Sequence, residues 1–366
     1  MKITTNRDDL LKPLLQVAGV VERRQTLPIL ANVLISAQKE RLDIVATDLE
    51  VELRTRATAQ NSGEADFTVP ARKLLDICKA LPEGADIEIT LEGEKVTLRS
   101  GRGRYTLGVL PAQDYPTIEP SAASESLALP ERVLKRLIEK TQFAMAHQDV
   151  RYYLNGMLLE IRPGRIRTVA TDGHRLALCD SKFDGERDIS LQVILPRKAV
   201  NELARLLSDT EEPARIELSP THVRMYLQSS TFTSKLIDGR FPDYERVMPS
   251  GQPQIVSANR ELLRQALART AILSNEKYRG IRFRLNGNML HLQAHNPEQD
   301  EAEEEVEIAY RGDEVTIGFN VGYLLDVLGV LDTEEVHIAV TDANSSALIT
   351  AGDSANCRYV VMPMRL

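Results

Sequence analysis

The segment TVATDGHRLALCD, residues 168–180, holds four kinds of reactive side chain close together: Asp172, His174, Arg175 and Cys179. Carboxylates, imidazoles and thiols act as general acids and bases, as nucleophiles and as metal ligands. A catalytic or metal-binding site is therefore one interpretation of this segment. A second pair of candidate metal ligands stands four residues apart in NMLHLQAHN, at His291 and His295.

The surroundings of these residues do not support catalysis. The two histidines of NMLHLQAHN alternate with apolar residues, and this period of two predicts a strand with both histidines on its polar face. The chain has no GxSxG elbow, no HExxH pair and no glycine-rich phosphate loop. Because reactive residues without such a context indicate chemistry only weakly, we keep the enzyme as an alternative hypothesis.

The letters VATD occur twice, at residues 45–48 and 169–172, and no histidine or cysteine follows the first copy. The recurrence calls for a search for longer repeats, because a missed repeat misassigns the whole fold. Segments that open at Pro70, Pro196 and Asn320 share a short amphipathic helix, alternating strands and a final aromatic residue before an apolar–proline pair. They start 126 and 124 residues apart, close to a third of the 366-residue chain.

A similar segment of helix, polar joint and strands precedes each of these three. VATD then marks the end of an equivalent strand in repeats one and two, and residues 293–296 are the counterpart in repeat three. The pattern predicts an α+β fold of three similar domains, each with two helices and antiparallel sheets. Joints rich in Pro, Ser and Gly at 116–126 and 249–254 favour the boundaries 1–120, 127–248 and 249–366. Helices are expected at residues 6–24, 71–80, 131–140, 197–206, 259–269 and 320–331.

The composition, with 43% apolar and 27% charged residues, is typical of a globular protein. Charged residues at 8, 9 and 12 interrupt the start of the chain, and no apolar run is long enough to cross a bilayer, so a cytoplasmic protein without a membrane partner is expected. The odd number of cysteines has no CxxC spacing, which predicts buried thiols in a reducing compartment and neither a disulfide framework nor a zinc site. These cysteines are Cys78, Cys179 and Cys357.

The distribution of charge is more informative than its total. A formal net charge of −8 argues against a nucleic-acid partner, yet basic residues outnumber acidic residues in five of the six expected helices. In the helix at 131–140, four cations share one face: Arg132, Lys135, Arg136 and Lys140. A solvated helix face would explain one such helix, whereas the recurrence favours a basic surface that contacts phosphates without reading sequence, as in a tube with DNA inside.

Two charge runs of opposite sign are complementary, one in repeat one and one in repeat three. RSGRGRYTLGVL is basic through Arg99, Arg102 and Arg104, and NPEQDEAEEEVE is acidic through Glu298, Asp300, Glu301, Glu303, Glu304 and Glu305. Each run alone is typical of a solvated surface, because exposed ion pairs contribute about 0 to 1 kcal/mol. Together they predict a head-to-tail interface, and such an interface closes a ring when the rotation between copies permits.

The full chain resembles the bacterial β sliding clamps, the β subunits of DNA polymerase III. The pieces that carry the resemblance are TLPILANVL, PARKLLDICKALPEGA, QFAMAHQDVRYYLNGM, VATDGHRLAL, TSKLIDGRFPDYERV, AILSNEKYRG, NPEQDEAEEE and YVVMPMRL. The resemblance implies a homodimeric ring that encircles duplex DNA, with helices lining the hole, and it implies no catalytic residue, cofactor or metal. A clamp loader driven by ATP would open the ring, and the clamp would tether polymerase to DNA.

The family's DNA contacts correspond to Arg24, Arg72, Gln148, Tyr152 and Tyr153, although alternation along the chain leaves one of the two tyrosines open to a core role. Its dimer interface corresponds to Lys73, Arg102, Arg104 and Leu107 on one side and to Ile272, Leu273, Glu298, Asp300, Glu301 and Glu303 on the other. The helix at 320–331 has no cation, so its part in DNA contact stays open.

The family also has an apolar pocket that takes short linear peptides from the polymerase III catalytic subunit, the clamp loader, other polymerases and repair proteins. The terminal segment YVVMPMRL has two methionines, whose unbranched side chains can pack against several different peptides. The alternative interpretation of YVVMP is an ordinary last strand. Besides the enzyme, the other alternative hypothesis is a scaffold of three protein-binding domains that does not bind DNA. The corresponding pocket residues are Arg151, Leu154, Thr171, Gly173, His174, Arg175, Leu176, Pro242, Arg246, Val247, Asn320, Tyr323, Ser346, Val360, Met362, Pro363, Met364 and Arg365.

Overall fold

The computed structural model describes residues 1–21, 27–119, 122–183, 190–249, 251, 253–352 and 354–365. It consists of two compact units, one formed by residues 1–134 and 201–236 and the other by residues 135–200 and 237–366. All strand pairs in its named sheets are antiparallel, and helices accompany them, so the α+β prediction is confirmed. Within the described ranges, every helix is too short or too polar to cross a membrane.

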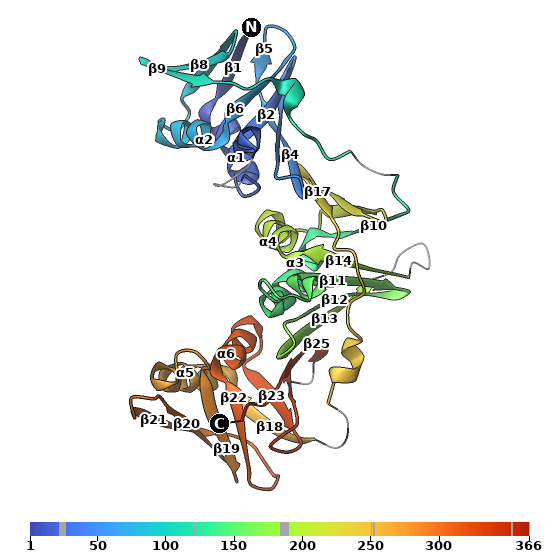
Figure 1. Ribbon diagram of the computed structural model, residues 1–366, viewed down its shortest axis with the longest axis vertical. Coiled ribbons are helices and arrows are strands. Elements are labelled where there is room, and N and C mark those ends of the chain that lie inside the picture. Colours follow the sequence, from blue (N-terminus) through green and yellow to red (C-terminus); the bar gives the residue numbers. More distant parts are fainter. Residues whose placement is uncertain are drawn as a thin grey trace. The chain divides into compact units, whose positions relative to one another are not determined.

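The first unit contains a five-stranded and an eight-stranded sheet (Figure 1). The five-stranded sheet has the order β5 (Gln60–Asn61), β1 (Lys2–Asn6), β7 (Asp86–Glu92), β8 (Lys95–Ser100) and β9 (Gly103–Gly108). The eight-stranded sheet has the order β10 (Glu125–Pro130), β15 (Pro213–Leu218), β16 (His222–Tyr226), β17 (Ser230–Lys235), β4 (Val51–Thr58), β3 (Arg41–Thr47), β2 (Asn32–Gln38) and β6 (Ala65–Pro70).

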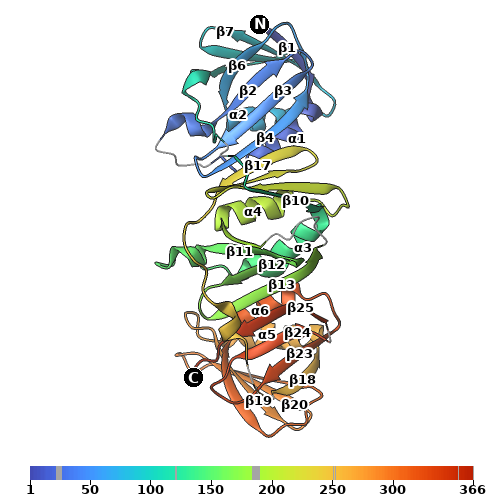
Figure 2. The same cartoon turned by 90° about the vertical axis from the view of Figure 1, so that its right-hand side faces the viewer.

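The second unit also contains an eight-stranded sheet and a smaller one, and Figure 2 shows strands of the large sheet in their order. The eight strands are β14 (Leu191–Pro196), β11 (Gly156–Arg162), β12 (Gly164–Thr171), β13 (Arg175–Phe183), β25 (Ser354–Val361), β24 (Ala347–Ala351), β23 (Glu335–Val340) and β18 (Gln254–Asn259). The four strands of the smaller sheet are β21 (Glu301–Glu307), β20 (Met289–His295), β19 (Gly280–Asn286) and β22 (Val315–Asn320).

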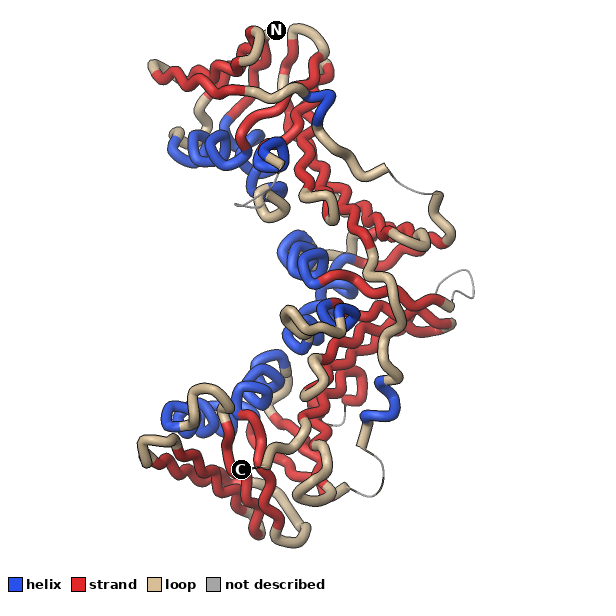
Figure 3. The backbone as a smooth tube through the Cα atoms, in the orientation of Figure 1, coloured by secondary structure: helices blue, strands red, loops and turns tan. Residues whose placement is uncertain are grey.

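The α-helices lie at the expected places, on one side of the large sheet in each unit (Figure 3). Asn6, Asn259 and Asn320 explain three of the starts, because each side chain accepts a hydrogen bond from the first turn of its helix. The first helix ends at Val17, so the predicted end at 24 is wrong; Gly19 follows, and glycine costs about 1 kcal/mol inside a helix. The helices are α1 (Arg7–Val17), α2 (Ala71–Ala80), α3 (Glu131–Thr141), α4 (Arg197–Leu206), α5 (Arg260–Thr270) and α6 (Val321–Val330).

The two VATD copies form the same turn. The Asp48 carboxylate accepts hydrogen bonds from the backbone of Glu50 and Val51 at 2.9 and 2.7 Å. The Asp172 carboxylate accepts the equivalent bonds from the two residues at 174 and 175, at 2.9 and 3.0 Å. Both turns contain one residue with positive φ, Leu49 at 77° and Gly173 at 90°. VATD is therefore an element of the fold, as the repeat predicts.

Each eight-stranded sheet joins strands of two successive repeats at one seam. In the first unit β17 pairs with β4, with Phe232 opposite Leu53. In the second unit β25 pairs with β13, with Tyr359 opposite Ala177. Phe232 and Tyr359 are fully buried, so each seam continues an apolar core from one repeat into the next.

The cysteines differ from the sequence prediction. Cys179 and Cys357 form a disulfide, whereas Cys78 is a free, buried thiol. The two bonded residues are 178 positions apart in the sequence but directly opposite each other across the β13–β25 seam. Sequence spacing contains no sign of this pairing, because it arises only when strands of two different repeats meet.

Gly156, the first residue of β11, allows a close approach of the Leu195 backbone. A Cβ atom there would lie 2.5 Å from the Leu195 carbonyl oxygen and 2.8 Å from Ile237. We expect Gly156→Ala to destabilise the protein by about 1–3 kcal/mol through overpacking, seen as a lower midpoint of urea unfolding. Gly63→Ala is the control, because that site has no atom within 4 Å. Equal midpoints for the two variants would contradict this packing.

Candidate functional site

The second unit contains an apolar pocket with a volume of about 200 Å³. Its floor comes from the buried side chains of Leu154, Leu176 and Val360. Its walls come from the β12–β13 turn, from the linker after Ile237 and from the end of the last strand. The complete lining is Arg151, Leu154, Thr171, Gly173, Arg175, Leu176, Pro242, Tyr244, Val247, Val360 and Met362.

Arg151 covers the β12–β13 turn at the rim of the pocket. A Cβ atom on Gly173 would lie 3.0 Å from the Arg151 guanidinium, so glycine permits both the turn and the close approach. Asp149 fixes the guanidinium with bonds of 3.0 and 2.8 Å. These hydrogen bonds lower the pKa of Asp149 to about 2, which keeps the carboxylate charged.

Arg175 joins the pocket to α6. Its guanidinium forms an ion pair with Asp326 of α6 and donates to the Phe143 carbonyl oxygen at 2.7 Å. The same group lies 4.5 Å from the centre of the Tyr323 ring, a cation–π distance. Arg175 therefore holds the turn in place as well as lining the pocket.

Tyr244 is a pocket residue that the sequence analysis missed. It sits in a short 3₁₀ helix, Tyr244–Val247, within the linker. Its ring belongs to the apolar cluster around Leu158, Leu178 and Phe241. No spacing in the sequence connects this linker tyrosine with the strands beneath it, so only the fold reveals its place.

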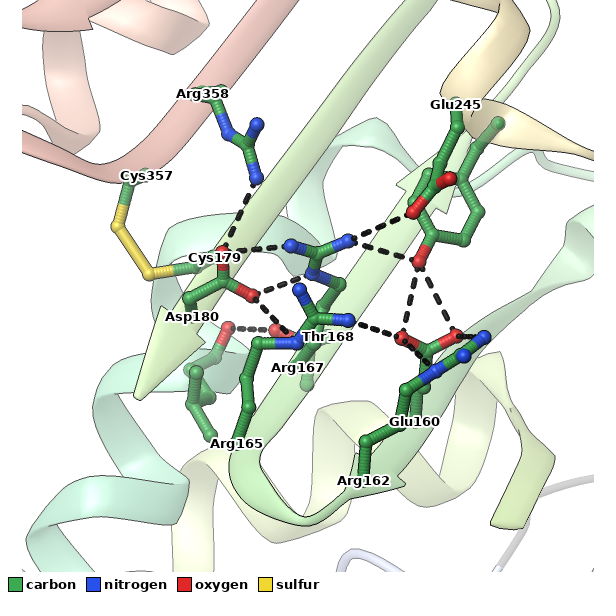
Figure 4. Close-up of polar contacts among 12 residues, drawn as sticks. Glu160, Arg162, Arg165, Arg167, Thr168, Cys179, Asp180, Glu245, Cys357 and Arg358 are labelled. Atoms are coloured by element: carbon green, nitrogen blue, oxygen red, sulfur yellow. Dashed lines mark hydrogen bonds and ion pairs between the residues drawn. A yellow bond between two sulfur atoms is a disulfide. The ribbon is translucent and has the colours of Figure 1, made fainter. Parts of the chain in front are cut away.

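A row of charged residues runs across three neighbouring strands (Figure 4). Glu160, Arg167 and Asp180 are successive partners on β11, β12 and β13. Arg167 donates to the Tyr244 hydroxyl at 3.0 Å and to Asp180 at 2.9 Å. The Tyr244 hydroxyl in turn lies 3.3 Å from each Glu160 oxygen.

Glu160 and Arg167 keep their ordinary charges, and Tyr244 stays neutral. Burial raises the pKa of Glu160, but hydrogen bonds from Gln192 and Arg162 lower it by more, so the carboxylate stays ionised. Burial would lower the pKa of Arg167, yet bonds to Asp180 and Tyr244 raise it overall. Burial also raises the pKa of Tyr244, so its hydroxyl keeps the proton that it donates.

The other predicted pocket residues lie outside this cavity. Met364 and Arg365 line a separate cavity of about 410 Å³ with Tyr278, Arg282 and His295. Asn320 caps α6, and Tyr323 contacts Arg175 as described above. The predicted residues that line neither cavity are His174, Arg246, Asn320, Tyr323, Ser346 and Pro363.

The predicted DNA contacts fall in two described places. Arg72 is exposed on α2, Gln148 is exposed in the loop after α3, and Tyr152 is exposed at the start of the 3₁₀ helix Tyr152–Asn155 before β11. Tyr153 is only partly exposed and packs against the apolar cluster below the pocket. Arg24 lies outside the described residues.

Several helix cations also bind the ends of neighbouring helices. Arg7 in α1 donates to the Cys78 carbonyl oxygen in α2 at 3.1 Å, and Arg260 in α5 donates to Leu328 in α6 at 3.2 Å. Lys140 in α3 binds the last turn of α6. The last carbonyls of a helix lack partners and carry partial negative charge. Part of the basic character of the helices is therefore structural.

The predicted interface residues cluster at two sheet edges. In the described structure β9 pairs with β8 only and β21 pairs with β20 only, so each strand has one open side. Ile272, next to the acidic strand, is 77% exposed. Arg104 and Leu107 lie on β9 with Arg102 before it and Lys73 on α2; Glu301 and Glu303 lie on β21, with Glu298 and Asp300 before it and Ile272 and Leu273 after α5.

The residues that suggested an enzyme do not converge. Asp172 closes a turn, Cys179 is in a disulfide, and His174 is exposed. His291 forms a contact of 3.0 Å with Glu305 on the neighbouring strand. Within the described residues, no group of three or more His, Cys, Asp or Glu side chains could hold a metal ion.

Sequence comparison covers nearly the whole chain. Models of the DNA polymerase III beta subunit match as its N-terminal domain at residues 1–119, its central domain at 128–243 and its C-terminal domain at 245–365. The beta sliding clamp of Pseudomonas aeruginosa is 54% identical over 367 residues and that of Escherichia coli K12 is 50% identical, in both cases with 100% of each chain covered.

Solved structures agree with the sequence relatives. A DNA polymerase sliding clamp from Pseudomonas aeruginosa superposes with a TM-score of 0.96 at 53% identity, covering 100% of both chains. A sliding clamp from Caulobacter crescentus has a TM-score of 0.95 at 39% identity, covering 100% of this chain and 99% of its own. The chain therefore belongs to the DNA polymerase III beta subunit family, the bacterial sliding clamps.

Proposed function

We propose that two copies of this chain close head to tail around duplex DNA through the edges of β9 and β21, and that the apolar pocket holds peptides from partner proteins. The chain is a processivity clamp and a non-catalytic accessory subunit of DNA polymerase III, as its family membership shows. The residue-level account of closure and binding is our proposal. The repeated seam is the observation that carries it.

The open edges have the same place in their repeats as the two seams. One side of each seam is the last strand of a repeat, β17 or β25, and β9 is the corresponding strand of the first repeat. The equivalence rests on three cross-strand pairs: Leu98–Tyr105, Met225–Phe232 and Ile349–Tyr359. The other side of each seam is the strand that follows the VATD turn, β4 or β13, and β21 is the corresponding strand of the third repeat. Because β17 binds β4 and β25 binds β13, we expect β9 to bind β21 of another copy.

The equivalence also predicts the register of that contact. Phe232 lies opposite Leu53 in one seam and Tyr359 lies opposite Ala177 in the other. The corresponding pair between copies is Tyr105 and Ala302. One residue away, Arg104 then lies directly opposite Glu303, with both side chains on the same face of the joined sheet.

The chemistry of the edges supports this pairing. β9 and the turn before it are basic, whereas β21 is an almost continuous run of glutamates. Unpaired strand edges invite uncontrolled association, so pairing them satisfies their backbone groups and removes a hazard. Lys73, Arg102 and Leu107 would lie on the β9 side, facing Ile272, Leu273 and the acidic residues at 298–301.

For DNA, we propose contacts that read no sequence. Arg24 and Arg72 suit phosphates, and Tyr152, exposed beside Gln148, suits stacking on a frayed or single strand. Tyr153 supports the pocket from below, which leaves it less available. Helix α6 has no cation and would contribute least. We place this activity in the cytoplasm and keep the boundaries 1–120, 127–248 and 249–366.

For partners, we prefer the pocket of about 200 Å³ to the larger cavity. Its floor is buried and apolar, as a site for peptide side chains should be, whereas none of the residues that line the larger cavity is buried. A sliding clamp from Pseudomonas aeruginosa has been solved bound to griselimycin. We expect the polymerase III catalytic subunit, the clamp loader, other polymerases and repair proteins to use this pocket through short linear motifs.

Charge reversal at the predicted register tests ring closure. Arg104→Glu alone and Glu303→Arg alone should each give monomers, because each places like charges opposite each other at both interfaces. A mixture of the two variants should restore dimers, since one interface is then charge-swapped and the other is native. Analytical ultracentrifugation measures the outcome, and monomers in the mixture would contradict the register.

If the closed ring encircles DNA, the protein should stay on a circular DNA because it cannot slide off an end, and not because it binds the DNA tightly. After loading by the clamp loader on nicked circular DNA, the protein should stay bound in moderate salt and should leave when a nuclease linearises the circle. Gel filtration of the DNA before and after cutting measures retention. Equal retention on linear DNA with free ends would mean ordinary binding, and no retention on either would favour the scaffold without DNA.

Deletion of residues 362–366 should abolish polymerase stimulation and leave the dimer intact. The last strand ends at Val361, so the deletion spares the β13–β25 seam. It removes Met362, a lining residue whose backbone donates to His174 at 2.9 Å. Primer extension and size-exclusion chromatography measure the two properties. Normal stimulation by the truncated protein would contradict the role of the pocket.

A further inference from the structure

We propose that Tyr244 is a positioning residue for partner binding: Glu160 and Arg167 hold its hydroxyl, and the hydroxyl holds the linker wall of the pocket in its binding-competent place. This inference rests on the proposed role of the pocket as a peptide site. It gives a physical reason for the position of the linker wall.

The charged row is too deeply buried to be a surface feature. Glu160 is 1% exposed and Arg167 is 4% exposed. Burying such charges is costly, and an apolar pair of similar volume often stabilises a protein equally well. A role in stability alone therefore gives no reason for charge at these positions, whereas a demand for one specific arrangement does.

The row binds the linker as well as its own strands. Arg167 donates to Asp180 within the sheet, and its remaining nitrogen reaches the Tyr244 hydroxyl at 3.0 Å and Glu245 at 3.6 Å. The guanidinium also lies 5.7 Å from the centre of the Tyr244 ring. With Glu160 accepting from the hydroxyl, one phenol is held from two strands at once.

Tyr244 transmits this fixation to the pocket because it is itself a wall residue. Its neighbours Pro242 and Val247 line the pocket on the same linker. The backbone of the linker is bound to the sheet at Ile237, which donates to the Ile194 carbonyl oxygen at 2.9 Å. Seven positions further along the linker, the Tyr244 side chain packs in the apolar cluster on the sheet and also lines the pocket.

The consequence is a pre-formed wall. When only a fraction of molecules has the competent wall, the apparent dissociation constant rises in proportion to the inverse of that fraction. A hydrogen bond of ordinary strength shifts such an equilibrium by about fivefold. Removing the hydroxyl should thus weaken partner binding even though the hydroxyl need not touch the peptide.

The test uses the full-length dimer and the purified catalytic subunit of the cognate polymerase III. Tyr244→Phe keeps the ring in the apolar cluster and removes only the hydroxyl, and we expect it to weaken affinity by up to about fivefold in surface plasmon resonance. Amide exchange of residues 242–248 should rise while the strands β11–β13 stay protected. The melting temperature should stay close to that of the unmodified protein.

Tyr226→Phe is the matched control. The Tyr226 hydroxyl donates to Glu217 at 3.1 Å and its ring lies 4.0 Å from the Arg215 guanidinium, the same combination at a site remote from the pocket in sequence and sheet. It should leave affinity unchanged. A double variant extends the test: Arg167→Met should weaken binding, and it should add little in the Tyr244→Phe background, because both act through one bond.

Leu176→Glu separates this inference from the proposed function. If that variant binds the catalytic subunit normally, the pocket is not the partner site and both proposals fail. If Leu176→Glu loses binding while Tyr244→Phe matches the unmodified protein, the positioning role alone is wrong. If Tyr244→Phe and Tyr226→Phe weaken binding equally, the effect is general and the positioning role is again overturned.

Discussion

Antiparallel pairing between strands of successive repeats is the interaction on which the rest of this structure depends. Each repeat ends in a strand with an unsatisfied edge, and such an edge must be covered, blunted or paired. The β17–β4 and β25–β13 seams solve the problem twice within the chain. In our proposal the third pair of edges, β9 and β21, pairs between two copies. Dimerisation of this chain would then use the same contact as the two seams.

The sequence was sufficient to predict much of this arrangement. Periodicity placed the helices, and the structure explains three of their starts through the caps at Asn6, Asn259 and Asn320. It could not predict which strands of different repeats meet. The disulfide between Cys179 and Cys357 and the contact of Tyr244 with the charged row both depend on such meetings, so neither leaves a local signal.

The charges serve two purposes that a residue count does not separate. Arg7 and Arg260 are basic helix residues, yet both bind the carbonyl end of a neighbouring helix in their own domain. Arg72, by contrast, is exposed on its helix and available to a phosphate. The helix cations of this chain are thus partly structural, so their number overstates how many are available to a phosphate.

Site-specific cross-linking tests whether β9 and β21 pair between copies in the same register as the two seams. Cys179 and Cys357 are directly opposite in one seam, and the equivalent pair between copies is Gly103 and Glu304. A chain with cysteine at both positions should form a covalently closed dimer on mild oxidation. A chain with cysteine at 103 and 305 should not, because its second side chain points to the opposite face. Cross-linking of the 305 pair, or none at 304, would contradict the account.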